Sequence, residues 1–256
     1  MKSFDTMKLV GALFAGTIML SLAPAHAQFG GPPPPSGPAR DVAPFDLTGQ
    51  WVSMVTEDWR FRMVTPPKND FPGLPLSAAG RAAADAWDPA RDEANGEQCK
   101  SYGAGGIMRM PGRLRISWDD ASTLEIETDA GRQTRVFHFD GTQPQGASEP
   151  SWQGRSVAEW QLHRANFRSP PVNGTIKVVT TGMRPGYFRK NGVSYGANAV
   201  LTEYYDLFVQ HDGSEWLQIL SIIDDPEYFT TPLITSSNFR RQTDRSGWNP
   251  RNCSAR

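Results

Sequence analysis

Residues 113–127 read RLRISWDDASTLEIE, and this stretch decides the fold that the sequence predicts. Apolar and polar side chains alternate over 113–118 and again over 123–127, and a period of two residues indicates strands with one buried face. Asp119 and Asp120 lie between the two runs and favour a turn. The stretch therefore predicts a β-hairpin.

The same period continues on both sides of this hairpin. Further strands are predicted around Trp51 and at 133–139, 155–163, 175–181, 199–210, 215–224 and 235–242, with Asn-Gly and Asp-Gly pairs as turns between several of them. About eight or nine strands at this spacing indicate a barrel or a sandwich, and closure into a barrel leaves no exposed edge. We therefore expect an all-β, mainly antiparallel barrel.

Gly49-Gln50-Trp51 opens the first predicted strand. A Gly-x-Trp sequence at this place resembles the lipocalin signature, in which the Trp fills one end of the barrel. The resemblance implies a lipocalin-like barrel, while an ordinary buried Trp would give the same three residues. The cluster of Arg240, Arg241 and Arg245 is expected to form a solvated terminus, and the alternative is that one of these arginines caps the barrel over Trp51.

One or two short helices are predicted between the first strand and the hairpin. Leu76 and Ser77 have the character of a hydrophobic staple and an N-cap, and the Ala-rich run 78–87 follows them. A second helical piece is predicted over 90–95. Both helices should lie on the surface of the sheet.

Residues 1–27 have the character of a secretory signal peptide. Lys2 and Lys8 precede an apolar run over 9–22, and Ala25-His26-Ala27 follows the small-x-small pattern of a cleavage site. A membrane anchor is the alternative, although the run of about 14 residues is shorter than the roughly 20 that span a bilayer. The protein is therefore expected to be periplasmic or secreted, without stable membrane insertion.

Residues 28–44 are rich in Gly and Pro, with four consecutive prolines at 32–35. Proline removes backbone donors and favours extended geometry, so this stretch predicts a tether rather than a core. A docking segment for another protein is the alternative interpretation. The barrel domain is then expected to span 45–256.

Composition excludes several classes of protein. The 256 residues are 38% hydrophobic and 11% aromatic, which is too apolar for a disordered chain, and the formal net charge of −1 does not fit a dedicated nucleic-acid binder. The chain has two cysteines, Cys99 and Cys253. In an oxidising compartment such a pair predicts one disulfide, with two free thiols or a metal pair as alternatives.

Three further segments carry a second resemblance. Residues 151–160, which read SWQGRSVAEW, Glu203 in a later strand, and 224–228, which read DDPEY, followed by Pro232, resemble a large, functionally uncharacterised family of exported bacterial proteins. The resemblance covers about residues 45–256 and implies the fold and the compartment. Arg155 and Tyr195 stand where histidines often occur in that family, so the resemblance implies no chemistry that depends on those histidines.

Glu203 and His138 are the candidate catalytic residues. Glu203 shares strand parity with Leu201 and Tyr205 and should point into the barrel, where a carboxylate either pairs with an arginine or titrates as an acid or base. A strand end facing solvent is the other alternative. His138 lies on one face of its strand with Val136 and could line a cavity or have only a structural role. The arginines considered as partners of Glu203 are Arg60, Arg62, Arg184 and Arg189.

Two functions follow from these residues. The first is binding of a small hydrophobic or amphipathic molecule in a barrel cavity, with no cofactor and no metal. Its apolar part would contact Trp118, Trp160 and Tyr205, and its polar end would be oriented by Arg184, Tyr187 and Glu203. The second is a cofactor-independent lyase, hydratase or isomerase that uses Glu203 or His138 for proton transfer. A structural envelope protein is a third interpretation.

Overall fold

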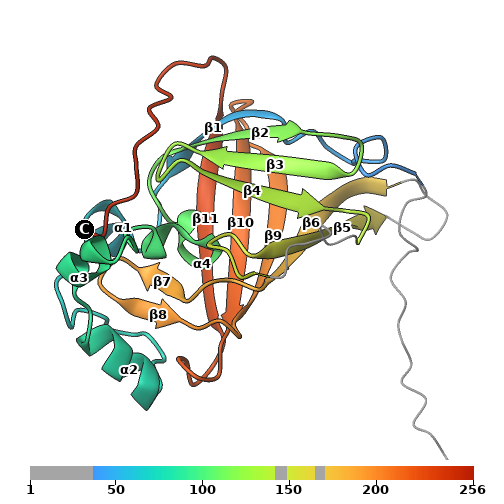
Figure 1. Cartoon of the computed structure of the whole chain (residues 1–256). Helices are drawn as coiled ribbons and strands as arrows, with labels where there is room; N and C mark the ends of the chain where they lie inside the picture. The colour runs from blue at the N-terminus through green and yellow to red at the C-terminus, as the bar shows by residue number, and fades with distance from the viewer. Residues whose placement is uncertain (1–36, 142–148, 165–170) are drawn as a thin grey trace, which may run out of the picture. The chain divides into compact units, whose positions relative to one another are not determined.

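The computed structural model describes residues 37–141, 149–164 and 171–256, and nine strands of this part of the chain close into a barrel (Figure 1). Around the barrel the strands follow the order β1-β11-β10-β9-β6-β5-β4-β3-β2, and β2 pairs with β1. Their bounds are β1 (Gly49–Met54), β2 (Arg113–Trp118), β3 (Thr123–Thr128), β4 (Gln133–His138), β5 (Arg155–Arg164), β6 (Pro171–Thr181), β9 (Val200–Val209), β10 (Glu215–Asp224) and β11 (Leu233–Gln242). The predicted β-barrel is confirmed.

Neighbouring strands of the barrel run antiparallel except at one place. β4 and β5 are parallel, and in the described residues they pair only at Phe137–Ser156 and His138–Val157. β5 and β6, in contrast, pair along the whole of Arg155–Arg164. We call the short parallel contact the β4–β5 seam.

The hairpin of β2 and β3 shows why the sequence folds in this way. Leu114 and Ile116 on β2 and Leu124 and Ile126 on β3 are buried, and the residues between them are more exposed. Successive side chains of a strand point to opposite faces, so the alternation turns one face of each strand toward the core.

Trp51 fills part of the barrel interior and is capped by an arginine. Its side chain is fully buried, its Nε1 donates to the carbonyl oxygen of Leu47 at 2.9 Å, and the Arg241 guanidinium lies 4.3 Å from the ring centre. The alternative for the terminal arginine cluster, a cap over Trp51, is therefore the one observed, with Arg241 in that role. Gly49 has φ 123°, and a Cβ there would lie 2.9 Å from Nη1 of Arg241, which accounts for glycine at this position.

The segment before β1 packs against the barrel. Ala39 is buried and its carbonyl oxygen accepts the Nε1–H of Trp160 at 2.9 Å. Phe45 meets the Trp160 ring edge-on at 5.2 Å, and Phe139 lies 5.4 Å from the same ring. The folded structure therefore extends upstream of residue 45. The predicted signal peptide and the first part of the predicted tether lie outside the described residues.

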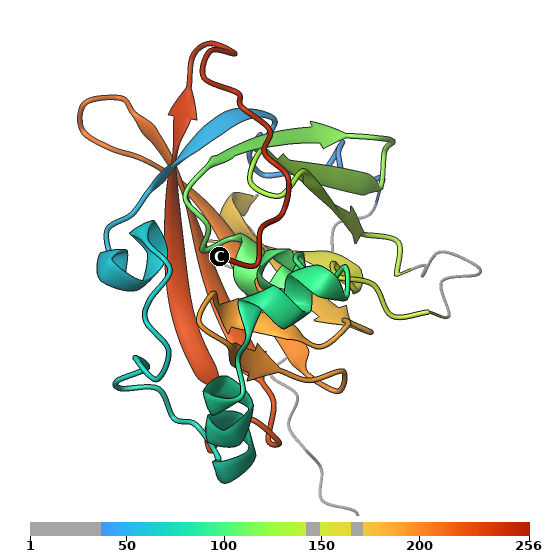
Figure 2. The same cartoon turned by 60° about the vertical axis from the view of Figure 1, so that its left-hand side comes forward.

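Helices and a second, two-stranded sheet gather on one side of the barrel (Figures 1 and 2). Ser77 caps the predicted helix, because its side chain accepts the N–H of Gly80 at 3.0 Å. The small sheet of β7 and β8 was not predicted, because its strands are short. The elements on this side are α1 (Trp59–Met63), α2 (Ala78–Asp85), α3 (Pro89–Ala94), the 3₁₀ turn η1 (Lys100–Tyr102), α4 (Ala104–Ile107), β7 (Gly186–Arg189) and β8 (Val193–Tyr195). None of the helices in the described ranges has the length and apolar character needed to cross a bilayer.

Candidate functional site

Glu203 on β9 points into the barrel, as its strand parity predicts. Its side chain is 1% exposed and forms an ion pair with Arg135 on β4, with 2.7 Å between Nη2 and Oε2. The four arginines that the sequence offered as partners were the wrong ones. Arg135 shares the inward face of β4 with Phe137, and that parity is the signal that would have identified it.

Hydrogen bonds fix this buried ion pair. Arg135 donates from Nη1 to the Tyr205 hydroxyl at 3.1 Å and from Nη2 to the Thr180 hydroxyl at 3.2 Å, and Ser221 donates to Glu203 at 3.4 Å. Burial raises the pKa of Tyr205 well above its ordinary value. On β9, Glu203 lies between Leu201 and Tyr205, and these two residues belong to two separate apolar clusters of the core. The charges thus neutralise each other inside the barrel wall.

His138 lies on the other side of that wall. The inward-facing residues of β4 are Arg135 and Phe137, and His138 faces outward, where it borders a surface cleft of about 490 Å³ together with Val136 and Trp152. The structure therefore does not bring His138 and Glu203 to a common cavity.

The residues predicted to bind a ligand also lie at several separate places in the structure. Trp160 and Trp118 both pack on Phe139 near the segment before β1, with Trp118 at 5.4 Å from that ring. Tyr187 donates its hydroxyl to Asp92 at 2.7 Å. Arg184 stacks on Trp152 at 4.0 Å. Together with Tyr205, which packs on Phe137 in the core, these side chains form several contacts rather than one pocket.

A cleft of about 600 Å³ lies between α1, the rim of the barrel and the C-terminal segment. We call it the rim cleft. It joins apolar and cationic side chains, among them Arg62, Met63, Val64, Met110, Lys190 and Arg251. Asp129 is the only acidic side chain among the described residues of its lining, and it accepts the backbone N–H of Arg113 at 2.7 Å. The rim cleft therefore carries an excess of positive charge.

Arg62 is the most unusual residue of this lining. Its side chain is 1% exposed, and its Nε donates to the carbonyl oxygen of Arg109 at 2.9 Å. Nη1 and Nη2 are buried and have no hydrogen-bond partner among the described residues, and the nearest carboxylate is that of Glu57 at 3.9 Å from Nη1. Burial lowers the pKa of Arg62. Unpaired buried donors of this kind are costly and require an explanation, such as a bound water or ligand.

Two further arginines surround Asp58 beside Arg62. Arg109 and Arg189 both donate to Oδ2 of Asp58, at 2.8 and 3.0 Å. Their guanidinium groups stack on Phe188 at 4.3 Å and on Phe61 at 4.2 Å. Burial lowers the pKa of Arg109 to about 10, although Asp58 acts in the opposite direction. The three guanidinium groups thus share two carboxylates, Asp58 and the more distant Glu57.

Asp58 itself should make this region sensitive to acid. Burial raises its pKa, but the two arginines outweigh burial and hold the pKa below its ordinary value of 3.8. A carboxylate of this kind stabilises the fold above the pKa of the unfolded chain, and this stabilisation is lost as the pH falls through the lower folded-state pKa. We expect Asp58→Asn to unfold more easily at neutral pH and to lose less stability than the parent protein on acidification. Urea titrations at several pH values test this, with Asp70→Asn, which removes the partner of the exposed Arg60, as control.

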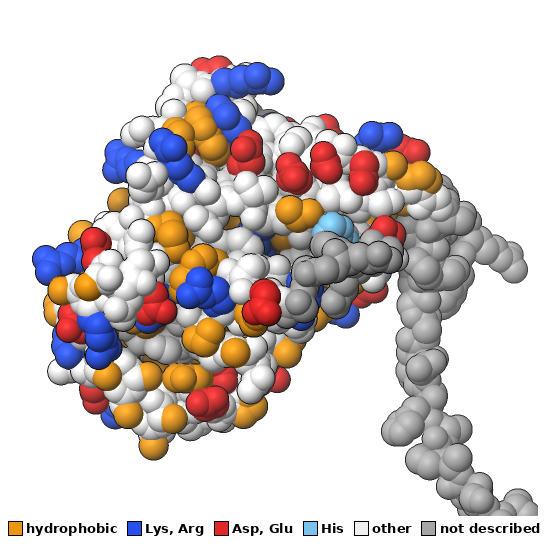
Figure 3. Space-filling model, viewed as in Figure 1, with side chains coloured by type: hydrophobic (Ala, Val, Ile, Leu, Met, Phe, Trp, Pro, Cys, Tyr) orange, Lys and Arg blue, Asp and Glu red, His pale blue; other side chains and the backbone are white. Residues whose placement is uncertain are grey.

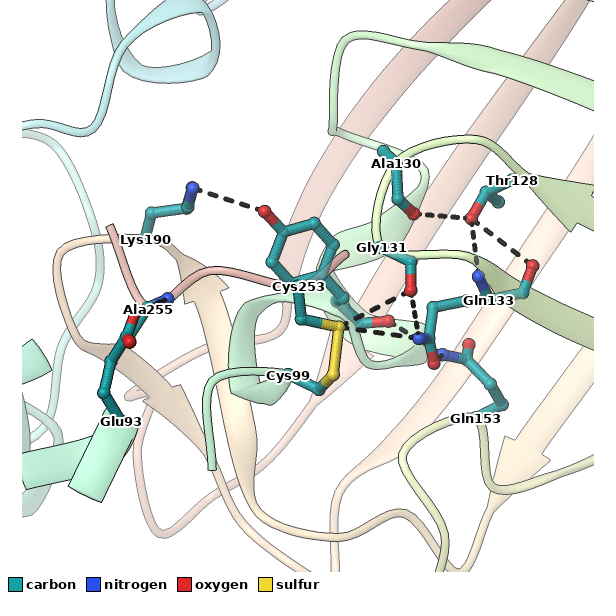
Figure 4. Close-up of a disulfide and its surroundings, with 11 residues drawn as sticks. Glu93, Cys99, Thr128, Ala130, Gly131, Gln133, Gln153, Lys190, Cys253 and Ala255 are labelled. Atoms are coloured by element: carbon teal, nitrogen blue, oxygen red, sulfur yellow. Dashed lines mark hydrogen bonds between the residues drawn. A yellow bond between two sulfur atoms is a disulfide. The ribbon is translucent and has the colours of Figure 1, made fainter. Parts of the chain in front are cut away.

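The C-terminal segment forms one wall of the rim cleft and is held at several points. Trp248 lies under the Arg115 guanidinium at 4.0 Å, and the N–H of Arg251 donates to the Asp129 carbonyl oxygen at 2.8 Å. Cys253 then forms a disulfide with Cys99, which confirms the predicted pairing (Figure 4). The disulfide thus fixes the position of this wall.

Lys190 links the turn between β7 and β8 to the same wall. Its Nζ donates to the backbone oxygen of Arg256 and lies 3.5 Å from the Tyr102 hydroxyl. Burial lowers the pKa of Lys190. On the face shown in Figure 3, Lys and Arg side chains alternate with hydrophobic ones over α2, α3 and the β7–β8 sheet.

The sequence did not predict the rim cleft. Arg62, Lys190 and Arg251 belong to a helix, a turn and a terminal segment that only the tertiary structure brings together. The local signals were the cysteine at 253, which implies that the segment around it is held, and an excess of Arg around Asp58 and Arg62 in the stretch 58–62, DWRFR.

Comparison of the chain with models of known protein families, with curated proteins and with solved structures finds no match.

Proposed function

We propose that this is an exported binding protein that holds a small amphipathic molecule in the rim cleft. The observation that carries the proposal is the composition of the lining, in which cationic and apolar side chains meet in one space of about 600 Å³. Ligand pockets typically have volumes of roughly 300–1,000 Å³ and combine an apolar surface with a few polar groups.

The apolar part of the proposed site is open to solvent. Met63 and Val64 line the cleft and are 55% and 65% exposed, and Trp59 on the same helix is 66% exposed. Exposed apolar groups that lie together in this way favour contact with an apolar partner. A short alkyl or aryl group on these residues would leave its polar end toward Arg62 and Lys190.

The site differs from the barrel cavity that the sequence suggested. Inside the barrel, Glu203 and Tyr205 already have protein partners, Arg135 above all. Arg135 Nε and Glu203 Oε2 have no hydrogen-bond partner among the described residues either, but they lie in the closed core, whereas Arg62, whose Nη1 and Nη2 are also without such partners, lines a cleft with room for a ligand. The proposed ligand is therefore still a small amphipathic molecule, but it would bind in the rim cleft and not inside the barrel.

Export is supported by two features of the chain. The signal-peptide pattern predicts secretion across the inner membrane. The disulfide between Cys99 and Cys253 is of the kind that persists in oxidising compartments. We therefore propose a periplasmic or secreted location.

Binding of anionic alkyl amphiphiles tests the proposal. We expect octanoate and octyl sulfate to bind with micromolar to millimolar affinity, measured by calorimetry, and the uncharged octyl glucoside to bind more weakly, because the lining is cationic. Val64→Asp should weaken binding by about tenfold, since it removes an apolar contact and adds a negative charge.

Val209→Asp is the matched control, because Val209 is equally exposed, at 63%, and does not line the rim cleft. Its affinity should equal that of the parent protein. The proposal is wrong if the amphiphiles do not bind, or if Val64→Asp and Val209→Asp have the same affinity.

A further inference from the structure

Arg62 lines the rim cleft and has an unused hydrogen-bonding fork just below its surface. Its Nε is occupied by the Arg109 carbonyl oxygen, which leaves Nη1 and Nη2 without hydrogen-bond partners among the described residues. Both atoms are buried, so bulk water does not satisfy them, and a ligand oxygen would reach them after a shift of the lining side chains. The paired terminal nitrogens of arginine match two oxygens of one oxyanion.

The cluster around this fork carries more positive than negative charge. Arg62, Arg109 and Arg189 share Asp58 and Glu57; Oε1 of Glu57 lies 3.9 Å from Nη1 of Arg62, and its Oε2 accepts the hydroxyl of Ser236 at 2.7 Å. Among the described residues, Nη1 of Arg109 and Nε and Nη1 of Arg189 have no hydrogen-bond partner, and neither has Oε1 of Glu57. An added anion would therefore be stabilised by several charges at once.

Asp58 holds two of these arginines in position. It has φ 51°, in the left-handed region that non-glycine residues seldom adopt. Its carboxylate accepts hydrogen bonds from Arg109 and Arg189 and thereby fixes both guanidinium groups. Arg62 is in turn oriented by the backbone of Arg109, so the fork is built into the fold before any ligand arrives.

Lys190 adds a further positive charge to the cleft. Its ammonium lines the same cleft and donates to the backbone oxygen of Arg256. The lining also includes Arg113, Arg251 and Arg256, against Asp129 as the acidic residue of the described lining. This imbalance favours a dianion over a monoanion.

We propose that the Arg62 corner of the rim cleft is a subsite for a phosphate monoester group, backed by the Arg109–Asp58–Arg189 cluster. This inference rests on the proposed function and specifies the polar end of its ligand. A phosphate monoester carries nearly two charges at neutral pH and three terminal oxygens, which suits a fork that is short of negative charge. A carboxylate brings one charge and two oxygens to the same donors.

Calorimetry on the full chain tests the subsite with hexyl phosphate, heptanoate and inorganic phosphate. The ionic strength is held constant, and the pH is kept well above about 6, the second pKa of a phosphate group. We expect hexyl phosphate to bind about tenfold or more tightly than heptanoate, because both carry the same six-carbon chain and only the headgroups differ. Inorganic phosphate distinguishes free phosphate from an ester as the source of the group.

Two variants assign the preference to its residue. Arg62→Gln should reduce the affinity for hexyl phosphate to that for heptanoate, and Arg60→Gln, on the same helix but 61% exposed and paired with Asp70, should leave both affinities unchanged. Lys190→Gln, which keeps a hydrogen-bond donor, should weaken the binding of hexyl phosphate more than that of heptanoate. The Lys190 variant and the headgroup comparison remain informative if Arg62→Gln fails to fold.

The outcomes separate this inference from the proposed function. Equal affinities of the parent protein for hexyl phosphate and heptanoate would overturn the phosphate subsite while leaving the amphiphile site intact. Binding of inorganic phosphate that depends on Arg62, with no gain from the hexyl chain, would support the subsite and overturn the amphiphile site. An unchanged headgroup preference in both Arg62→Gln and Lys190→Gln would also overturn the subsite.

Discussion

Replacing Arg135 by methionine is expected to lower the free energy of unfolding by about 3–5 kcal/mol, the cost of leaving one member of a buried ion pair alone. Arg135 and Glu203 are 0% and 1% exposed, so the remaining carboxylate would have no access to water. Arg135→Met keeps most of the volume and removes the charge. Equilibrium unfolding in urea measures the loss.

The double variant Arg135→Met, Glu203→Leu is the informative comparison. Because it removes both charges together, it should recover most of the stability that the single variant loses. Lys177→Met serves as control, since Lys177 pairs with Glu159 at 3.1 Å on the exposed face of the sheet and should contribute only about 0–1 kcal/mol. If Arg135→Met and Lys177→Met lose the same stability, the ion pair does not have the structural role assigned to it.

The second large effect is expected from the disulfide. Changing both Cys99 and Cys253 to serine should destabilise the protein by up to roughly 5 kcal/mol, because the crosslink closes a loop over a sequence separation of 154 residues in the unfolded chain. The variant should also release the C-terminal wall of the rim cleft. Thermal unfolding and limited proteolysis at the C-terminal segment measure the two consequences.

A reducing agent provides the control for this variant. It should bring the parent protein to the stability of the double serine variant and should not change that variant further. Unchanged stability and unchanged proteolysis after reduction would contradict the view that the crosslink holds the wall.

The barrel was predictable from the sequence because its signals are local. Alternation in 113–127 set the faces of β2 and β3, and the same parity argument correctly turned Glu203 inward. The sequence also offered the cap of Trp51 by Arg241 as an alternative, since the Gly-x-Trp strand and the terminal arginine cluster are each visible in it.

The partner of Glu203 and the rim cleft were not predictable in the same way. Parity states which face a side chain occupies, but it does not state which strands lie opposite one another after closure. Arg135 and Glu203 meet because β4 and β9 face each other across the interior. The rim cleft depends on the path of the C-terminal segment, which packs through isolated long-range contacts such as Arg251 with Asp129 and has no periodic pattern.

The β4–β5 seam gives the barrel one junction that differs from all the others described. At Phe137–Ser156 and His138–Val157 the ladder is two pairs long, whereas the antiparallel junctions beside it extend over most of each strand. Local opening events begin where the fewest backbone hydrogen bonds must break. Transient access of solvent to the interior would therefore start beside Phe137 and would reach the guanidinium of Arg135 before it reached the deeper apolar layers.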